Sequence, residues 1–369
     1  MKSVLTSFII ASIVILTPVG SVFAQVGITG VPFLQIEPDS RAAGMGNAGA
    51  AIADNAAAIF WNPAGLGFQK GTQFSITHSN WLPSFNTDLF YDYVVGTHHI
   101  DGIGTIGGHV TFLNLGEQTR TNEKGDALGT FRSYDITVGA SYGVALNENL
   151  SVGTGLRFIY SNLAPAIEVG GQQASKGTTV GADIGVLYQT SEKEIMGRNG
   201  QFRAGFNLSN IGPGIQYSDE AQKDPLPTLL RTGVAYKTDL DAEGFNTFTI
   251  TADVSKIMAR SDTSGNTMNF GEALFKSWDT YTYNNGTKFV DVPLSEQLMF
   301  GFGAEYWYDQ KFALRGGYYY ESPQNGDRQY MTVGAGLRYN MFGVDFSYVI
   351  AQKDAPLANT IRFSLLLNI

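Results

Sequence analysis

Two glycine-rich motifs could support nucleotide binding or nucleophilic catalysis in a suitable fold. Residues 102–107 (GIGTIG) match G-x-G-x-x-G, and residues 139–143 (GASYG) match G-x-S-x-G. The first motif holds a pyrophosphate only where a helix follows it, and the second exposes a nucleophilic serine only at a strand-to-helix turn. The first is followed by the strand-like GHVTFL, and Ser141 falls in the middle of an alternating stretch. We therefore expect neither nucleotide binding nor hydrolase activity.

The four histidines do not have the spacing of a metal site. His98 and His99 are adjacent in a strand-like stretch and would point to opposite faces, and an H-E-x-x-H pattern is absent. The chain has no cysteine, and its acidic residues are scattered, mostly in expected loops. We predict a non-enzymatic protein with no catalytic residue, no metal and no cofactor.

Residues 38–67 (PDSRAAGMGNAGAAIADNAAAIFWNPAGLG) are rich in alanine and glycine and lack the alternation of a strand. They cannot face lipid, and the segment is too short to hold its own core. We interpret residues 25–70 as a plug folded inside the mouth of a barrel. Asn62 and Pro63 form a turn-starting pair, and Asp54 could cap a helix that begins near Asn55. The candidate site residues, expected to have a structural role in this plug, are Asp54, Trp61, Asn62, Pro63, Ala64 and Gly65.

The elements after this segment are strands with one apolar and one polar face. Residues 135–144 (DITVGASYGV) alternate strictly, which is typical of a strand exposed to two different environments. Many such strands predict an all-β fold, a transmembrane antiparallel β-barrel occupying residues 71–369. The expected strands number about 14: 72–79, 90–98, 103–115, 132–146, 149–161, 177–190, 200–209, 229–238, 246–256, 297–308, 311–321, 329–340, 343–351 and 359–369.

The connections and charges agree with this strand assignment. Long loops (80–89, 116–131, 162–176, 210–228, 257–296, 322–328, 352–358) alternate with mostly short turns, as expected for outer and periplasmic connections. The turn at 191–199 is longer than expected for a short periplasmic connection. Trp307 and Tyr308 flank the turn 309–310, where an interfacial aromatic belt is expected. Six arginines fall on the polar phase, away from lipid: Arg157, Arg203, Arg231, Arg315, Arg338 and Arg362.

The N-terminus and the composition indicate export to an outer membrane. Lys2, an interrupted apolar stretch and the sequence Val22-Phe23-Ala24 predict a signal peptide over residues 1–24. The formal charge of −9, without basic runs, argues against nucleic-acid binding. The mean hydropathy of −0.05 fits a barrel that contacts outer-membrane lipid only through alternate side chains.

Two sets of motifs carry a resemblance to known families. Residues 49–54 (GAAIAD) and 61–66 (WNPAGL) resemble the N-terminal motif of FadL-type long-chain fatty-acid transporters. Nearly the whole chain after the signal resembles, in order and spacing, the PorV family of type IX secretion. The segments that carry this second resemblance are 32–42, 44–46, 157–161, 208–212, 314–321, 325–330, 334–340 and 345–348.

The second resemblance implies a FadL-like barrel of fourteen strands without enzymatic activity. It implies a protein that binds the C-terminal signal domain of cargo proteins at the type IX translocon barrel. The cargo would then pass to a surface-attachment complex with a PorU-type sortase. The loops 210–228 and 257–296 are the expected cargo contacts. Three alternatives stay open: a FadL-type transporter of hydrophobic molecules, a structural barrel or porin, and a role like that of the sister group PorQ.

Overall fold

The computed structural model describes residues 29–85, 88–122, 124–163, 168–169, 172–173, 176–195, 197–217, 223–260, 268–284, 289–353 and 355–369. The expected signal peptide at 1–24 lies outside these residues. Among the described residues, no helix has the length and apolar composition needed to cross a membrane.

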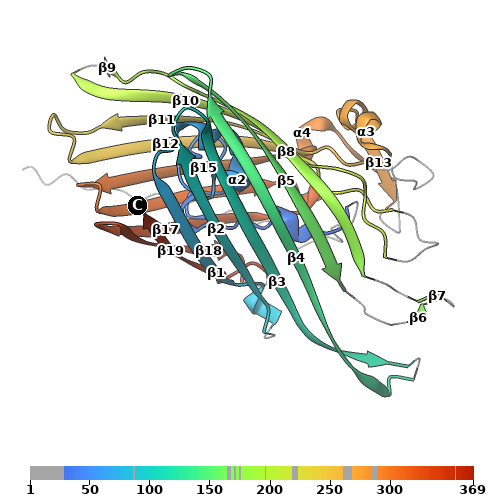
Figure 1. Ribbon diagram of the computed structural model, residues 1–369. Helices are drawn as coiled ribbons and strands as arrows, with labels where there is room; N and C mark the ends of the chain where they lie inside the picture. Colours follow the sequence, from blue (N-terminus) through green and yellow to red (C-terminus); the bar gives the residue numbers. More distant parts are fainter. Residues whose placement is uncertain are drawn as a thin grey trace, which may run out of the picture.

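Fourteen antiparallel strands close into a barrel (Figure 1). Each strand pairs with the next along the sheet, and the first pairs with the last through Ile76 opposite Leu365. All fourteen strands predicted from alternation are confirmed. They are β1 (Thr72–Asn80), β2 (Phe90–Ile100), β3 (Gly104–Thr121), β4 (Ala127–Ala145), β5 (Leu150–Asn162), β8 (Gly177–Gln189), β10 (Arg198–Ile211), β11 (Leu229–Asp239), β12 (Asn246–Ile257), β15 (Leu298–Tyr308), β16 (Phe312–Glu321), β17 (Gln329–Tyr339), β18 (Phe342–Ala351) and β19 (Ile361–Asn368).

The two faces of the strands are the lipid face and the lumen face. On β5, Leu156 is 68% exposed, whereas its neighbour Arg157 is 6% exposed and points inward. On β4, Asp135 and Thr137 are buried and Val138 is exposed. The predicted inward phase of the arginines is confirmed, since a guanidinium on the lipid face would cost about 2–4 kcal/mol at the midplane.

Two predicted connections are shorter than expected because pairing continues beyond the barrel wall. The loop expected at 116–131 shrinks, since β3 and β4 stay paired to Thr121 and Ala127. Strands of this length exceed the roughly 9–11 residues needed to cross a bilayer, so the hairpin extends past the rim (Figure 1). The unusually long turn at 191–199 contains a short strand, β9 (Lys193–Ile195), paired with the start of β10.

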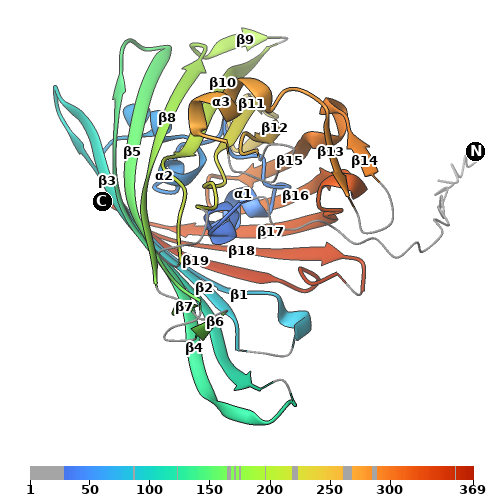
Figure 2. The same ribbon diagram turned by 90° about the vertical axis from the view of Figure 1, so that its right-hand side faces the viewer.

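Residues 31–69 form short helical pieces inside the barrel. These are η1 (Pro32–Gln35), α1 (Ser40–Ala43), α2 (Ala58–Trp61) and η2 (Pro63–Phe68). Figure 2 shows α1 and α2 enclosed by the barrel strands. Most residues from Val31 to Gln69 are buried.

The remaining elements lie at the end with long loops. The loop after β12 contains α3 (Phe270–Lys276), a hairpin of β13 (Tyr281–Asn284) and β14 (Phe289–Val292), and α4 (Leu294–Gln297). The other elements are η3 (Pro83–Phe85), η4 (Pro323–Asn325) and a two-stranded ladder of β6 (Glu168–Val169) and β7 (Gln172–Gln173).

Candidate functional site in the lumen and outer loops

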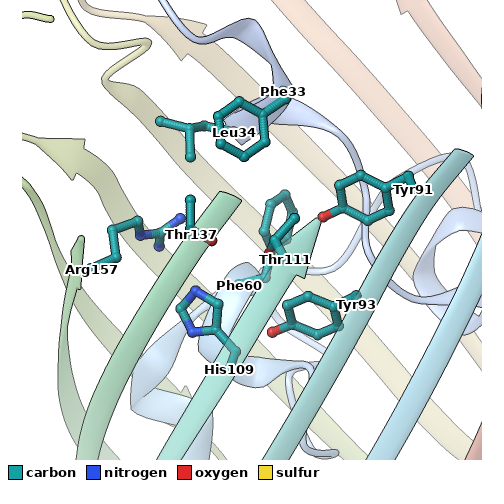
Figure 3. A pocket seen from close by; sticks show the side chains of 9 residues that line it. All are labelled: Phe33, Leu34, Phe60, Tyr91, Tyr93, His109, Thr111, Thr137 and Arg157. Atoms are coloured by element: carbon teal, nitrogen blue, oxygen red, sulfur yellow. The ribbon is translucent and has the colours of Figure 1, made fainter. Parts of the chain in front are cut away.

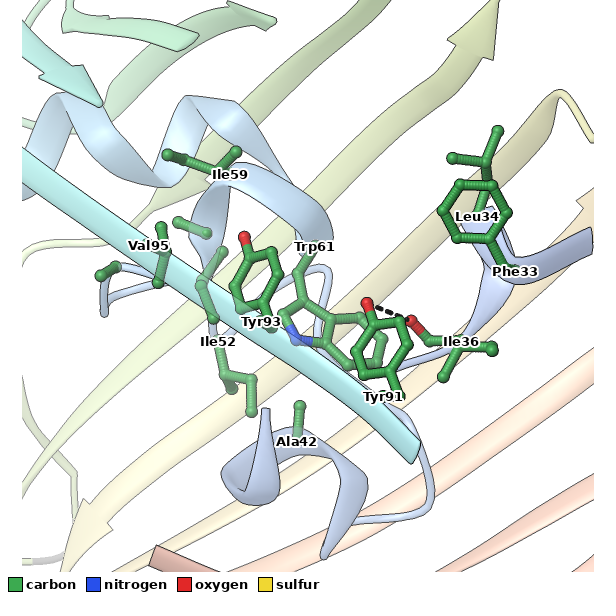
Figure 4. Close-up of a cluster of buried hydrophobic side chains, with 14 of the residues drawn as sticks. Phe33, Leu34, Ile36, Ala42, Ile52, Ile59, Trp61, Tyr91, Tyr93 and Val95 are labelled. Atoms are coloured by element: carbon green, nitrogen blue, oxygen red, sulfur yellow. Dashed lines mark hydrogen bonds between the residues drawn. The ribbon is translucent and has the colours of Figure 1, made fainter. Parts of the chain in front are cut away.

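The lumen is filled by a hydrophobic core centred on Trp61. The indole packs with Ile36, Ile52 and the inward-facing Tyr91 and Tyr93 of β2, all of them buried (Figure 4). Its Nε1 donates a hydrogen bond to the Asp39 carboxylate. A single cluster thus joins the N-terminal segment to the barrel wall, and the lumen has the character of a protein core.

Glycines on the lumen face of the wall let the backbone of residues 31–69 approach closely. A Cβ on Gly303 would lie 2.5 Å from the Cβ of Met45, and one on Gly317 would lie 2.8 Å from the Cα of Met45. Gly46 itself has φ 62°, and a Cβ there would lie 2.5 Å from the Phe302 and Tyr318 carbonyl oxygens. The same close approach recurs at wall glycines Gly143, Gly153, Gly185, Gly205 and Gly301. These glycines therefore provide the space that the segment needs to pack directly against the backbone of the barrel wall.

Polar side chains of the wall and the segment satisfy the segment's backbone. Asp253 of β12 accepts 2.8 Å hydrogen bonds from the amides of Gly49 and Ala50. Asn62 donates to the carbonyl oxygens of Ala50 (3.1 Å) and Val186 (3.0 Å), and its own Oδ1 accepts from the Ala64 amide. Each such bond satisfies a buried backbone group that would otherwise be costly to bury.

An ion-pair network ties the segment to strands β10, β15 and β16, which lie in one part of the barrel wall. Arg41 of α1 donates to Glu305 of β15 at 2.9 and 2.8 Å and also pairs with Asp54. Arg203 of β10 pairs with Asp54 at 3.0 Å. Glu305 also accepts a 2.7 Å hydrogen bond from Arg315 of β16.

The network continues along the wall and has a counterpart nearer the outer end. Arg315 pairs with Asp345 of β18 at 2.8 Å, and Arg338 of β17 pairs with the same carboxylate at 2.7 Å. Arg362 of β19 pairs with Glu37 of the segment at 3.0 Å. Because these charges are buried, removing one partner costs more than breaking a surface pair.

Two aspartates of the segment, the buried Asp39 and the more exposed Asp54, have pKa values shifted in opposite directions. Burial raises the pKa of Asp39, although its hydrogen bond from Trp61 opposes the shift. Burial would also raise the pKa of Asp54, but the charges of Arg41 and Arg203 outweigh it and leave this pKa below its usual value. Asp54 is therefore held as a carboxylate between two guanidinium groups.

The structure places all six sequence-predicted site residues in this segment. Pro63 and Ala64 begin η2, and Asn62 is the residue that caps it, with its side chain accepting from the Ala64 amide. Gly65 lies so close to the Ala53 carbonyl that no side chain would fit there. The suggestion that Asp54 caps a helix is wrong: its carboxylate pairs with the two arginines, and the Asn55 side chain accepts from the Ala57 amide instead.

Several residues of the site were missed by the sequence reasoning. Glu305, Asp253 and the lumen glycines lie far from the segment in sequence, and only the closure of the barrel brings them to it. Their common signal was a charged or small residue on the polar phase of a strand. The expectation that Trp307 belongs to an interfacial belt is wrong, because its ring faces inward and lies 5.4 Å from the Arg315 guanidinium.

Space beside the core is small. A pocket lined by residues that include Leu34, Phe60, Tyr93 and His109 has a volume of about 10 Å³ (Figure 3). This is room for about one water molecule. The buried Met299 and Tyr319 pack with Leu229, Tyr330 and Val349 in a second hydrophobic cluster.

The outer loop 210–228 folds back into the barrel mouth. Ile215 and Leu226 are 0% and 2% exposed and belong to the same core as Trp61. The Gly30 amide donates to the Pro225 carbonyl at 2.9 Å, and Ile215 forms a bridge with Asp224. The described part of this loop therefore covers the N-terminal segment from outside.

The described parts of the outer loop 257–296 are folded and present aromatic side chains to solvent. In and just after α3, Phe275 is 78% exposed and Trp278 is 43% exposed. Asn269 caps the start of α3. Arg260 donates to carbonyl oxygens that follow the helix, at 3.1 Å for Asp279 and 2.8 Å for Thr280. The aromatic pair is thus held on an ordered base.

The motifs that could have supported chemistry lie in strands. Gly104 begins β3, so no helix follows residues 102–107, and Ser141 lies within β4 with its side chain toward the lumen. His98 and His99 bond to different neighbours, Thr72 and Thr105. Within the described part of the chain, no group of three or more histidine, aspartate or glutamate side chains is placed to hold a metal ion.

The barrel is similar in fold to the solved structures of two toluene transporters. The toluene transporter TbuX of Ralstonia pickettii matches with a TM-score of 0.52 and 14% identity, covering 91% of this chain and 100% of that one. The toluene transporter TodX of P. putida matches with a TM-score of 0.51 and 10% identity, covering 90% and 99%. A FadL homologue of Pseudomonas aeruginosa matches with a TM-score of 0.43 and 12% identity, covering 90% and 98%.

Comparison with protein families gives a more specific result. A search of the curated proteins found no match. The family model described as "Type IX secretion system protein PorV" matches residues 23–263, more than half of the chain. Together with the closed barrel, this places the protein in the outer membrane. The chain belongs to the PorV family of type IX secretion system proteins.

Proposed function

We propose that this protein is a non-enzymatic cargo carrier of type IX secretion. In this proposal it binds the C-terminal signal domain of secreted proteins at the translocon barrel. It then passes them to a surface-attachment complex containing a PorU-type sortase. Family membership supports the role in secretion, and the filled lumen supports a carrier over a channel.

The alternative, a FadL-type transporter of hydrophobic molecules, is favoured only by the shared barrel fold. A cavity of about 150 Å³ accommodates benzene, whereas the pocket beside the lumen core has about 10 Å³. A larger pocket of about 220 Å³, at the end of the barrel with short turns, is lined mostly by charged and polar side chains. Buried hydrogen bonds from Asp253 and Asn62 hold the filling segment in place. Transport would therefore require the segment to leave a well-satisfied position.

One observation indicates which part of the protein would bind cargo: the exposed aromatic pair, Phe275 and Trp278, in the α3 loop. Large aromatic side chains on an ordered base are typical anchors of protein interfaces. Phe275 and Trp278 meet this description. The loop 210–228 is the weaker candidate, because Ile215 and Leu226 are already used inside the barrel mouth.

The test is a native co-purification from the outer membrane in mild detergent. The protein carries a tag in an exposed loop, and co-purifying proteins are identified by mass spectrometry. We expect the translocon barrel and secreted proteins that share one C-terminal domain. Recovery of the barrel alone, with bound fatty acid or hydrocarbon, would overturn the proposal in favour of a transporter.

The site is tested with the double substitution Phe275→Ser and Trp278→Ser. We expect at least a tenfold loss of co-purified cargo, since interface aromatic anchors contribute about 2 kcal/mol or more. Phe85→Ser is the matched control, because Phe85 is an exposed aromatic (55%) in a different outer loop. Unchanged cargo recovery with the double variant would reject the α3 loop as the dock.

A further inference from the structure

A second pocket opens beside the ion-pair network at the end of the barrel with short turns. Its volume is about 220 Å³. Its lining includes Gln73 at the start of β1, Gln310 in a tight turn and Asn368 at the end of β19. In barrels of this type the short turns face the periplasm, so the pocket is open to periplasmic molecules.

The pocket carries more positive than negative charge. Arg41, Arg203, Lys237 and Arg338 line it, against the carboxylates of Asp54 and Glu305. The ion pairs directly behind this lining add one more cation, Arg315, and one more carboxylate, Asp345. Five cations thus share three carboxylates, which leaves an excess of two positive charges.

Lys237 gives the pocket a cation without a side-chain partner, and Trp307 gives it a flat aromatic wall. Lys237 lies on the lumen face of β11, and its side chain has no hydrogen-bond or ion-pair partner among the described residues. The Trp307 ring lies 5.4 and 5.2 Å from the guanidinium carbons of Arg315 and Arg338. This stacking orients two of the cations, so little reorganisation is needed to receive an anion.

We propose that this pocket binds a compact oxyanion of about two negative charges, a phosphate or a dicarboxylate, from the periplasm. Two unbalanced cations in a partly enclosed pocket attract such a group more strongly than the same charges on an open surface. Arginine forks suit the oxygens of phosphate and carboxylate alike. On the scale on which about 10–15 Å³ holds one water molecule, the volume of about 220 Å³ has room for the anion and several waters. This site goes beyond cargo binding, which uses the opposite end of the barrel.

The test is calorimetric titration of the purified full-length barrel with inorganic phosphate and, separately, with succinate, at constant ionic strength set by sodium chloride. Trp307 fluorescence is recorded in parallel, and Trp307→Phe identifies its contribution. The variant that tests the site is Lys237→Gln, which removes a cation from the pocket without leaving a carboxylate unpaired. The matched control is Lys193→Gln, at an exposed lysine of β9 outside the pocket.

We expect saturable binding of at least one probe and a shift in Trp307 emission. Lys237→Gln should weaken it about tenfold, the range of one charge-assisted hydrogen bond, and Lys193→Gln should leave it unchanged. Binding of phosphate alone or of succinate alone would identify the source of the oxyanion. Absence of binding for both probes overturns the proposal. The proposal is also overturned if the Lys237→Gln protein binds the anion with wild-type affinity. It is overturned as well if calorimetry detects binding but Trp307 emission does not change, since the anion would then bind elsewhere. None of these outcomes bears on cargo co-purification.

Discussion

Replacing Gly317 with alanine should undock part of the lumen segment while leaving the barrel closed. Gly317 lies on the lumen face of β16, and an added Cβ would fall 2.8 Å from the Cα of Met45 and closer still to the Gly46 nitrogen. The atoms that would be struck are backbone, and Gly46 is itself fixed between the carbonyls of Phe302 and Tyr318. Neither side can yield by a simple rotamer change.

The size of the destabilisation by Gly317→Ala can be estimated from the clash of the added Cβ with the backbone of Met45 and Gly46. Overpacking a close-packed interior costs about 1–3 kcal/mol, and a clash with two rigid backbone groups belongs at the upper end. The loss should also weaken the 2.9 Å hydrogen bond from the Gly46 amide to the Thr332 hydroxyl. We expect the free energy of local opening of residues 40–50 to fall by about 2–3 kcal/mol, a roughly 30- to 150-fold increase in the open population.

The assay is amide hydrogen exchange of the purified barrel, read by mass spectrometry on peptides covering residues 40–50. Gly316→Ala is the matched control, because Gly316 is the adjacent residue of β16 and an added Cβ there meets nothing within 4 Å. Exchange in the control should match the wild type. Equal protection in the Gly317→Ala and Gly316→Ala proteins would refute the claim that lumen glycines are contact surfaces for the segment.

Three further predictions test the charges and the two faces. Glu305→Gln takes one of two carboxylate partners from each of Arg41 and Arg315. Asp54 and Asp345 still pair with these arginines, so the docked segment should be destabilised by about 3 kcal/mol, the lower end of the range for a broken buried pair, seen as increased protease cleavage before residue 70. Leu156→Arg puts a charge on the lipid face and should lower the thermal unfolding midpoint, at a cost of about 2–4 kcal/mol. Leu128→Arg, on the β3–β4 extension, should have little effect on that midpoint. The pKa of Asp54 lies below its usual value near 3.8, so its stabilisation is present above pH 3.8 and is lost as the pH falls through the lower folded-state value. Hydrogen exchange of the segment should show this acid-dependent loss in the wild type, and Asp54→Asn should remove it.

The strand pattern was predictable because the lipid and lumen environments act on every residue of a strand separately. Alternation such as that of 135–144 therefore identified β4, and the same local signal identified the other thirteen barrel strands. The ends of β3 and β4 were not predictable, since beyond the bilayer both faces meet water and the alternation disappears. Trp307 was misassigned because a turn-flanking aromatic can face either lipid or lumen.

The sequence by itself determined the barrel, its approximate strand count, the inward phase of its arginines and the segment that could not be a strand. Each of these depends on local hydrophobicity and backbone preference. The tertiary structure decided which wall residues meet that segment. Three contacts join residues more than two hundred positions apart. Arg41 pairs with Glu305, Asp253 accepts hydrogen bonds from two backbone amides of the segment, and Gly46 packs closely against Gly317. No local pattern records such contacts, because they depend on the register of a closed sheet and on how the segment enters it.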